Sequence, residues 1–335
     1  MNLEEVAKRA GVSTATVSRV LNNLDVVRGA TRARVLAAVA ELKYHPNLHA
    51  RTLAGGKSHT IGMIASNMEN PFFFDIFRSL EAHARNAGFD VIVANTGYDP
   101  GRLVRHVRLM IGRRVAGLAM VVSEMDPTLI DELAAACIPC VFYDVGAARD
   151  NITNIRAGYR PAVHHIVAHL HSLGHRRFAF IGHHSSLGPT SERQMAFLEA
   201  VSQLQPAVAW QTAAADDGFD GGRDAARSLL DRGFSPTAIV CVNDFTAVGV
   251  LRELRSRGLR VPHDVSLTGF DNIRLSEYCD PPLTTVDIPR EEIGRLAFSA
   301  LAPACPAATP GREIVIEPRF ILRASTAPPQ SSTNP

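Results

Sequence analysis

The chain has 335 residues, 46% of them hydrophobic and 20% charged, which is typical of a globular protein with two or three domains. No apolar run approaches the roughly 20 residues that a membrane span needs, and the first residues lack the apolar core of a secretory signal. These features argue against a membrane or secreted protein. We therefore expect a cytoplasmic protein whose five cysteines are reduced.

The charge is unevenly distributed along the chain. Up to Lys57 there are nine basic and four acidic side chains, a net charge of +5, so the remainder carries −3 of the overall +2. A basic N-terminal segment on a mildly acidic body favours a local polyanionic partner. A solvated basic face is the alternative that composition alone leaves open.

The first 45 residues have the pattern of three helices. Asn2 and Glu5 have the spacing of a capping box, and Gly11 ends this first helix. Ser13 caps a second helix over residues 14–22, and Thr31 begins a third. The apolar positions that share the inner faces of these helices are Val6, Ala10, Val17, Val20, Leu21, Val35, Val39 and Leu42.

From residue 59 onward, strand-like apolar runs alternate with amphipathic helical segments. Repeated βα units predict parallel sheets with helices on both faces, either as one barrel or as two sheets divided near residues 151–158. Cys137 and Cys140 have the spacing of a redox motif, but they lie in an apolar run and we interpret both as packing residues. The predicted strands are Thr60–Ser66, Asp90–Asn95, Val115–Val122, Ile138–Asp144, Arg177–Gly182, Val208–Ala213, Ala238–Val242 and Val265–Phe270.

Two short helices joined by a Gly-Val-Ser turn predict a helix-turn-helix. Packing of the apolar side leaves small and polar residues on the outer face, where a recognition helix contacts the major groove. Arg19 can pair with guanine, while Thr14 and Ala15 can contact thymine methyl groups. The remaining candidates for contact with base edges or phosphates in this segment are Ser13, Thr16, Ser18 and Asn22.

A series of motifs, in order along nearly the whole chain to about Arg323, resembles the LacI/GalR family of bacterial transcription regulators. The motifs are VAKRAGVSTATVSRVLN, ELKYHPNLHARTLAGG, NPFFFDIF, RRVAGLAMV, FYDVG, LGHRRFAFIG, TSERQMAFLEAV, VNDFTAVG, VSLTGFDN and PPLTTVDIP. The resemblance implies an all-α helix-turn-helix head and an α/β body of two doubly wound parallel-sheet lobes, as in periplasmic binding proteins. It also implies a homodimer that binds a near-palindromic operator in double-stranded DNA.

The resemblance implies the following domain boundaries. Residues 1–45 form the DNA-binding domain, 46–58 the hinge helix and linker, and 59–323 the effector-binding and dimerisation domain. Lobe one is expected over about 59–156 and 290–321, and lobe two over about 157–289. Residues 324–335, rich in Ser, Thr, Pro and Gln, are expected to be disordered. In the hinge, Asn47, Ala50 and Leu53 would contact DNA, with Leu53 inserted in the minor groove or, alternatively, anchoring the hinge to the body.

Polar side chains stand where several predicted strands end, which is where ligands bind in open α/β sheets. The resemblance matches Asp144, Arg193, Asn243 and Asp271 to positions that hydrogen-bond effectors, and Phe73 to an aromatic that packs on ligand rings. Ser123 is a further candidate because it stands at the end of the predicted strand Val115–Val122. The effector is expected to be a sugar or sugar acid, acting as an inducer or a corepressor. The alternative is that Asp144 and Asp271 only cap neighbouring helices.

The remaining motifs favour a regulator over two other classes of protein. No P-loop, GxSxG, GxGxxG after a strand or spaced acid–base pair indicates an enzyme, and no cofactor is predicted. A solute-binding protein without a regulatory role is the alternative, opposed by the helix-turn-helix. The histidine cluster lacks zinc spacing, so we expect no metal; its members are His164, His165, His169, His171 and His175.

Overall fold

The computed structural model describes residues 2–21, 26–44, 58–125, 127–136, 138–146, 148–184, 188–301 and 310–330. The chain divides into two compact units, residues 1–58 and 59–335. None of the described helices is long and apolar enough to cross a membrane. Asn22, Asn47, Ala50, Leu53 and Cys137 lie outside the described residues, and what the sequence predicts for them stays a prediction.

The first unit contains three helices, α1 (Leu3–Ala10), α2 (Thr14–Leu21) and α3 (Gly29–Glu41). The capping box at the start of α1 is confirmed, since Asn2 and Glu5 each accept a hydrogen bond from the other's backbone amide. Gly11 ends α1 in the left-handed region at φ 63°, which glycine adopts without strain. The third helix begins at Gly29, two residues before the predicted Thr31, and Arg28 precedes it without a side-chain cap.

The core of this unit consists of small apolar side chains from all three helices. Val6, Val17 and Val35 are completely buried and meet at its centre. Arg9 of α1 forms a two-bonded ion pair with Glu41 of α3, which holds the ends of the two helices together on the surface. Because packing uses one side of α2, its opposite side is available to solvent.

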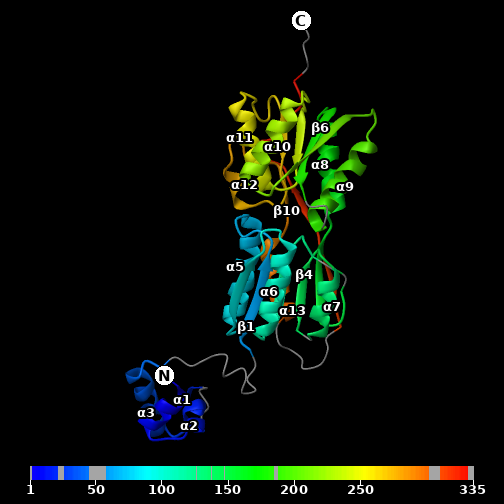
Figure 1. Cartoon of the computed structure of the whole chain (residues 1–335). Coiled ribbons are helices and arrows are strands. Elements are labelled where there is room, and N and C mark those ends of the chain that lie inside the picture. Colours follow the sequence, from blue (N-terminus) through cyan, green and yellow to red (C-terminus); the bar gives the residue numbers. More distant parts are fainter. Residues whose placement is uncertain are drawn as a thin grey trace. The chain divides into compact units, whose positions relative to one another are not determined.

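The second unit is built on two separate parallel sheets rather than one barrel, as Figure 1 shows. Sheet A has the order β11-β5-β4-β3-β1-β2 and sheet B the order β7-β6-β8-β9. Sheet A strands are β1 (Thr60–Ala65), β2 (Asp90–Asn95), β3 (Gly117–Val121), β4 (Cys140–Tyr143), β5 (Ile152–Ala157) and β11 (Glu313–Ile316). Sheet B strands are β6 (Arg177–His183), β7 (Ala209–Ala215), β8 (Ala238–Cys241) and β9 (Ser266–Thr268).

Helices cover both faces of each sheet. On sheet A, α5 and α13 pack on one face and α6 and α7 on the other; on sheet B, α8 and α9 lie opposite α10 and α11. The helices are α5 (Pro71–Asn86), α6 (Pro100–Gly112), α7 (Pro127–Ala135), α8 (Tyr159–Ser172), α9 (Gly188–Ser202), α10 (Phe219–Asp231), α11 (Asp244–Ser256), α12 (Arg274–Tyr278) and α13 (Arg290–Leu301). All eight predicted strands of the body are present, which confirms the doubly wound fold.

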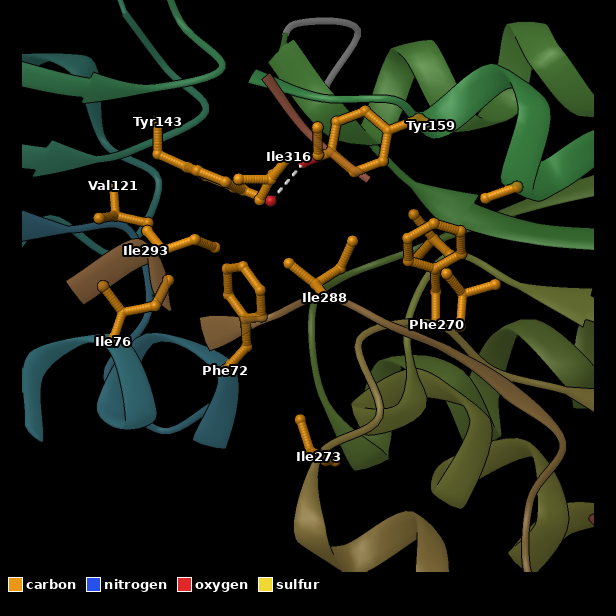
Figure 2. Packing of buried hydrophobic residues seen from close by; sticks show 14 of the residues in the cluster. Phe72, Ile76, Val121, Tyr143, Tyr159, Phe270, Ile273, Ile288, Ile293 and Ile316 are labelled. Atoms are coloured by element: carbon orange, nitrogen blue, oxygen red, sulfur yellow. Dashed lines mark hydrogen bonds between the residues drawn. The ribbon is translucent and has the colours of Figure 1, made fainter. Parts of the chain in front are cut away.

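The chain passes between the lobes three times, and a short antiparallel ribbon marks two of these passages. Ribbon strands β10 (Thr285–Asp287) and β12 (Arg319–Ile321) pair with each other, and the third passage runs from β5 into α8. One hydrophobic cluster continues through this region. Figure 2 shows Phe72 of lobe one next to Ile288, with Phe270 of lobe two on the other side of it, and the Tyr143 side chain pointing toward Tyr159 of lobe two. The lobes therefore share an apolar core at their connections.

Two predictions about the body were wrong. Residues 152–157, where the sequence predicted a division between two sheets and no strand, form the strand β5 between β4 and β11. The prediction that the tail is disordered from residue 324 is wrong for residues 324–330. Ser325 is completely buried, its hydroxyl donates to the carbonyl of Leu267, and its carbonyl accepts from the amide of Leu267. This segment thus continues the bonding of sheet B beyond β9.

Candidate functional sites

The outward side of α2 carries the residues predicted to contact DNA. Thr14, Ala15 and Arg19 are exposed, whereas Val17 and Val20 on the opposite side are buried. The Ser13 hydroxyl accepts a hydrogen bond from the amide of Thr16 and so caps the helix, and it lies 3.0 Å from the Thr16 hydroxyl. Ser18 is half-buried beside them. The helix thus presents small residues and one cation.

In the second unit, the ends of the strands bring five of the six predicted effector residues around one small cavity. Phe73 and Ser123 come from lobe one, while Arg193, Asn243 and Asp271 come from lobe two. Arg193 lies in the second turn of α9. The cavity measures about 30 Å³, which has room for a water molecule but not for a sugar ring.

Arg193 and Asp271 form a buried pair at the centre of this cavity wall. Nη1 of Arg193 donates to the carbonyl of Val242 and lies 3.4 Å from Oδ1 of Asp271. The guanidinium is held between the rings of Tyr159 and Phe270, with its carbon 4.8 and 4.6 Å from the ring centroids. The position of Arg193 is therefore fixed by aromatic packing as well as by charge.

Two atoms of this pair lack hydrogen-bond partners among the described residues, namely Nε of Arg193 and Oδ1 of Asp271. Buried polar atoms are normally paired, because an unpaired one costs about 1–3 kcal/mol. Burial raises the pKa of Asp271 to about 6 despite its attraction to Arg193 and Arg290. One hydrogen-bond donor and one acceptor of this pair are thus left for a ligand group.

Asp144 is the predicted effector residue that does not line the cavity. Its carboxylate accepts hydrogen bonds from the amide of Ala157, at 3.0 and 3.2 Å, and from the hydroxyl of Tyr159 at 2.7 Å. The Tyr159 hydroxyl lies 2.8 Å from that of Tyr143. Burial raises the pKa of Asp144 to about 6. Asp144 thus links the end of β4 by hydrogen bonds to the segment that runs from β5 into α8.

Several residues at the cleft have left-handed backbone conformations. The φ angles are 61° at Tyr98, 56° at Asp144 and 95° at Asp271. Residues other than glycine adopt such conformations at a cost of about 1–3 kcal/mol each, and they are concentrated at functional sites. The strain falls on the segments that follow the strands, where the ligand-binding residues were predicted.

The sequence reasoning missed Asp217, which lies at the cleft between β7 and α10. Its carboxylate accepts hydrogen bonds from Asn67, Asn70 and Tyr98 of lobe one and from Asn243 of lobe two. The rule applied to the other strands could have found it, since Asp216 and Asp217 follow directly after β7. Glu124, which accepts from the hydroxyls of Ser66 and Thr96 behind Ser123, was also missed.

The histidine cluster has a structural role where its contacts are described. His175 is buried, with its ring nitrogens within 3.1 Å of Thr237 Oγ1 and 3.0 Å of Ser266 Oγ. Burial lowers its pKa to about 4, so the ring is neutral. His165 stacks on Phe320. Cys140 is buried, and burial raises the pKa of its thiol to about 12, which removes its reactivity at neutral pH.

Comparisons with known proteins match both units. Residues 2–47 match the model of the lacI family of bacterial regulatory proteins, and residues 167–326 match a periplasmic binding protein-like domain. The chain is 34% identical over 305 residues to the HTH-type transcriptional repressor PurR of Photobacterium profundum, covering 89% of this chain and 90% of that protein. It is 31% identical over 326 residues to the ribose operon repressor of Haemophilus influenzae, covering 96% and 98%.

Among solved structures, the chain resembles the lac repressor dimer bound to operator and the anti-inducer ONPF. The TM-score is 0.80 at 28% identity, and the match covers 98% of this chain and 99% of that one. The likeness therefore extends over the helix-turn-helix unit and both lobes.

Proposed function

Since this chain belongs to the lacI family of bacterial regulatory proteins, we propose that it is a repressor whose affinity for operator DNA is controlled by a small molecule bound between its lobes. The relatives named above are transcriptional repressors, and the chain is a regulator rather than an enzyme. We further propose that it acts as a homodimer, the form in which the lac repressor binds operator.

The DNA-binding half of the proposal is supported by the exposed side of α2. Arg19 can form paired hydrogen bonds with guanine in the major groove, and Thr14 and Ala15 are small enough to let the helix backbone approach the bases. The hydroxyls of Ser13 and Thr16 can bind phosphate oxygens, and that of Ser13 can do so while it still caps the helix. Two such helices in a dimer would contact two half-sites about one turn apart.

The effector-binding half is carried by one observation: in the buried Arg193–Asp271 pair, Arg193 Nε and Asp271 Oδ1 have no hydrogen-bond partner among the described residues. A hydroxyl group can accept from the first and donate to the second, and a sugar or sugar acid has several such groups. Asn243 and Ser123 add further polar contacts at the same cavity, and Phe73 adds an aromatic face. Since the cavity is too small for a sugar, ligand entry requires the lobes to separate or the lining to rearrange.

Two experiments test this proposal. A gel shift of the full chain on the DNA upstream of its own gene should give a specific complex at physiological salt, and a failure to discriminate operator from unrelated DNA would contradict the DNA-binding role. A thermal-shift screen of neutral sugars, sugar acids and nucleosides should identify the effector, since a ligand at 100 times its Kd adds about 2.7 kcal/mol of stability. Ligand binding without specific DNA binding would favour a solute-binding protein.

A further inference from the structure

Asp217 is the one lobe-two carboxylate that the hydrogen bonds above connect to several lobe-one side chains. Its Oδ2 accepts from Asn67 Nδ2 at 2.9 Å, Asn70 Nδ2 at 3.3 Å and the Tyr98 hydroxyl at 2.8 Å. Its Oδ1 accepts from Asn243 Nδ2 at 2.8 Å, within its own lobe. We call these four uncharged donors the carboxylate cradle. Three of its four bonds cross between the lobes.

The cradle amides are oriented by the backbone. The side-chain oxygen of Asn70 accepts from the amide of Phe72 and caps α5, and that of Asn243 accepts from the amide of Thr246 and caps α11. The oxygen of Asn67 accepts from the amide of Glu69. Because all three oxygens are used in this way, all three NH2 groups are left to point toward Asp217. The cradle is therefore built to receive an acceptor with two oxygens.

The helices add to the preference for a negative charge. Asn70 and Asn243 cap the N-termini of α5 and α11, which have 16 and 13 residues, so the positive ends of two helix dipoles lie beside the cradle. Hydrogen bonds to an ionised acceptor are stronger than those between neutral groups. Consistent with a nearby negative charge, burial and Asp217 raise the pKa of Tyr98 well above its usual value.

Asp217 also separates two spaces. Its partners Asn70, Tyr98 and Asn243 line the inner cavity of about 30 Å³, whereas Asp217 itself lines an open pocket of about 450 Å³ with Glu69 of lobe one. We propose that Asp217 is a tethered ligand of the carboxylate cradle, which holds the cleft closed in the absence of an effector. A carboxylate on an external molecule cannot enter the cradle while Asp217 occupies it. The inference depends on the proposed function only in treating this cleft as the effector site.

The test needs no effector and no DNA. Hydrogen exchange of the full-length chain is measured for the amides of residues 66–73, since the amides of Glu69 and Phe72 are bonded to cradle asparagines. Asp217→Ala should speed their exchange by about tenfold or more, a factor that corresponds to about 1.4 kcal/mol. Sodium acetate should slow the exchange again in this variant, whereas sodium chloride at equal concentration should not. Acetate should leave the wild type unchanged.

Asp216→Ala is the matched control, because Asp216 is the adjacent carboxylate, exposed and lining the same open pocket. It should leave exchange at residues 66–73 unchanged. Unaltered exchange in Asp217→Ala, or acceleration that acetate reverses no better than chloride, would overturn the inference. Should Asp217→Ala not fold, Asp217→Asn replaces it, with faster exchange expected and no acetate effect because the cradle remains filled. A negative result in this test would not contradict the proposed effector site. A failed effector screen, in turn, would not contradict the role of Asp217.

Discussion

Replacing Asp271 with asparagine is expected to stabilise the ligand-free protein, although it removes one partner of a buried ion pair. Burial raises the pKa of Asp271 from 3.8 to about 6, even with the attraction of Arg193 at 3.4 Å included. One pKa unit corresponds to about 1.4 kcal/mol, so the folded chain disfavours the ionised carboxyl by about 3 kcal/mol relative to the neutral one. Asparagine has the shape of the neutral acid and avoids this penalty.

The sign of the pH dependence follows from the raised pKa. As pH increases from about 4 to about 6, the unfolded chain loses the Asp271 proton before the folded chain does, so the contribution of Asp271 to wild-type stability falls and then levels off. The gain from Asp271→Asn should therefore approach about 3 kcal/mol near pH 7.5 and be about half as large near pH 5. The same variant should lose its response to effector, since the amide that replaces the carboxylate does not offer a charged acceptor.

The assay is urea unfolding followed by the fluorescence of Trp210, the only tryptophan in the chain, which lies in β7 of the same lobe as Asp271. Asp231→Asn is the control: Asp231 forms an exposed ion pair with Arg257, and its loss should change stability by less than about 1 kcal/mol. The opposing expectation is that an unpaired Arg193 destabilises the fold by about 3–5 kcal/mol. Destabilisation of that size in Asp271→Asn would refute the reasoning, because attraction would then outweigh desolvation.

Three further outcomes are expected. Arg19→Ala should weaken operator binding by about 1–3 kcal/mol and relax one base position in a binding-site selection, whereas an equal loss on every sequence would reduce Arg19 to a phosphate contact. Gly249→Ala should destabilise the body by about 3 kcal/mol in urea, since a Cβ there would overlap the Phe219 carbonyl where α10 and α11 touch, while Gly112→Ala, with open space and no left-handed backbone, should have a smaller effect. Asp244→Asn should flatten the fall in wild-type stability up to about pH 8, because burial raises the pKa of Asp244 to about 8 and the unfolded chain ionises first.

The sequence predicted those parts of the structure that depend on local patterns. The Asn2 capping box, the left-handed Gly11 and the strands that end near Ser123 and Asn243 each follow from a few adjacent residues. The strand β5 was missed because polar and apolar residues are mixed in it and its place between β4 and β11 is set by distant partners. Strand pairing of this kind cannot be inferred from a propensity window.

Long-range hydrogen bonds account for the rest of what was missed. The position of Asp217 after a strand could have indicated the residue, but its hydrogen bond to Asn67 spans 150 positions of sequence, and nothing near either residue specifies the other. Ser325 lies in a segment whose composition is typical of disorder, but its hydroxyl accepts from the amide of Thr284 and donates to the carbonyl of Leu267. Composition describes how a segment behaves alone, and here a sheet edge supplies the partners that the segment lacks.

The contacts between the lobes differ in how easily they can open. At the passages, apolar packing is reinforced by Arg290, which binds Asp75 of lobe one and the carbonyl of Asn272 (Figure 2 shows the packing). Away from the passages, the contacts to Asp217 are hydrogen bonds to uncharged side chains, and water can replace each of them. Separation of the lobes would therefore break polar bonds and leave the apolar core at the connections in place. An effector changes operator affinity only through its differential affinity for the closed and open arrangements. An effector adds to that difference when it accepts from a donor that Asp217 now occupies. It also adds to it when it bonds Arg193 Nε or Asp271 Oδ1. Couplings of about 1–3 kcal/mol need only one or two such bonds.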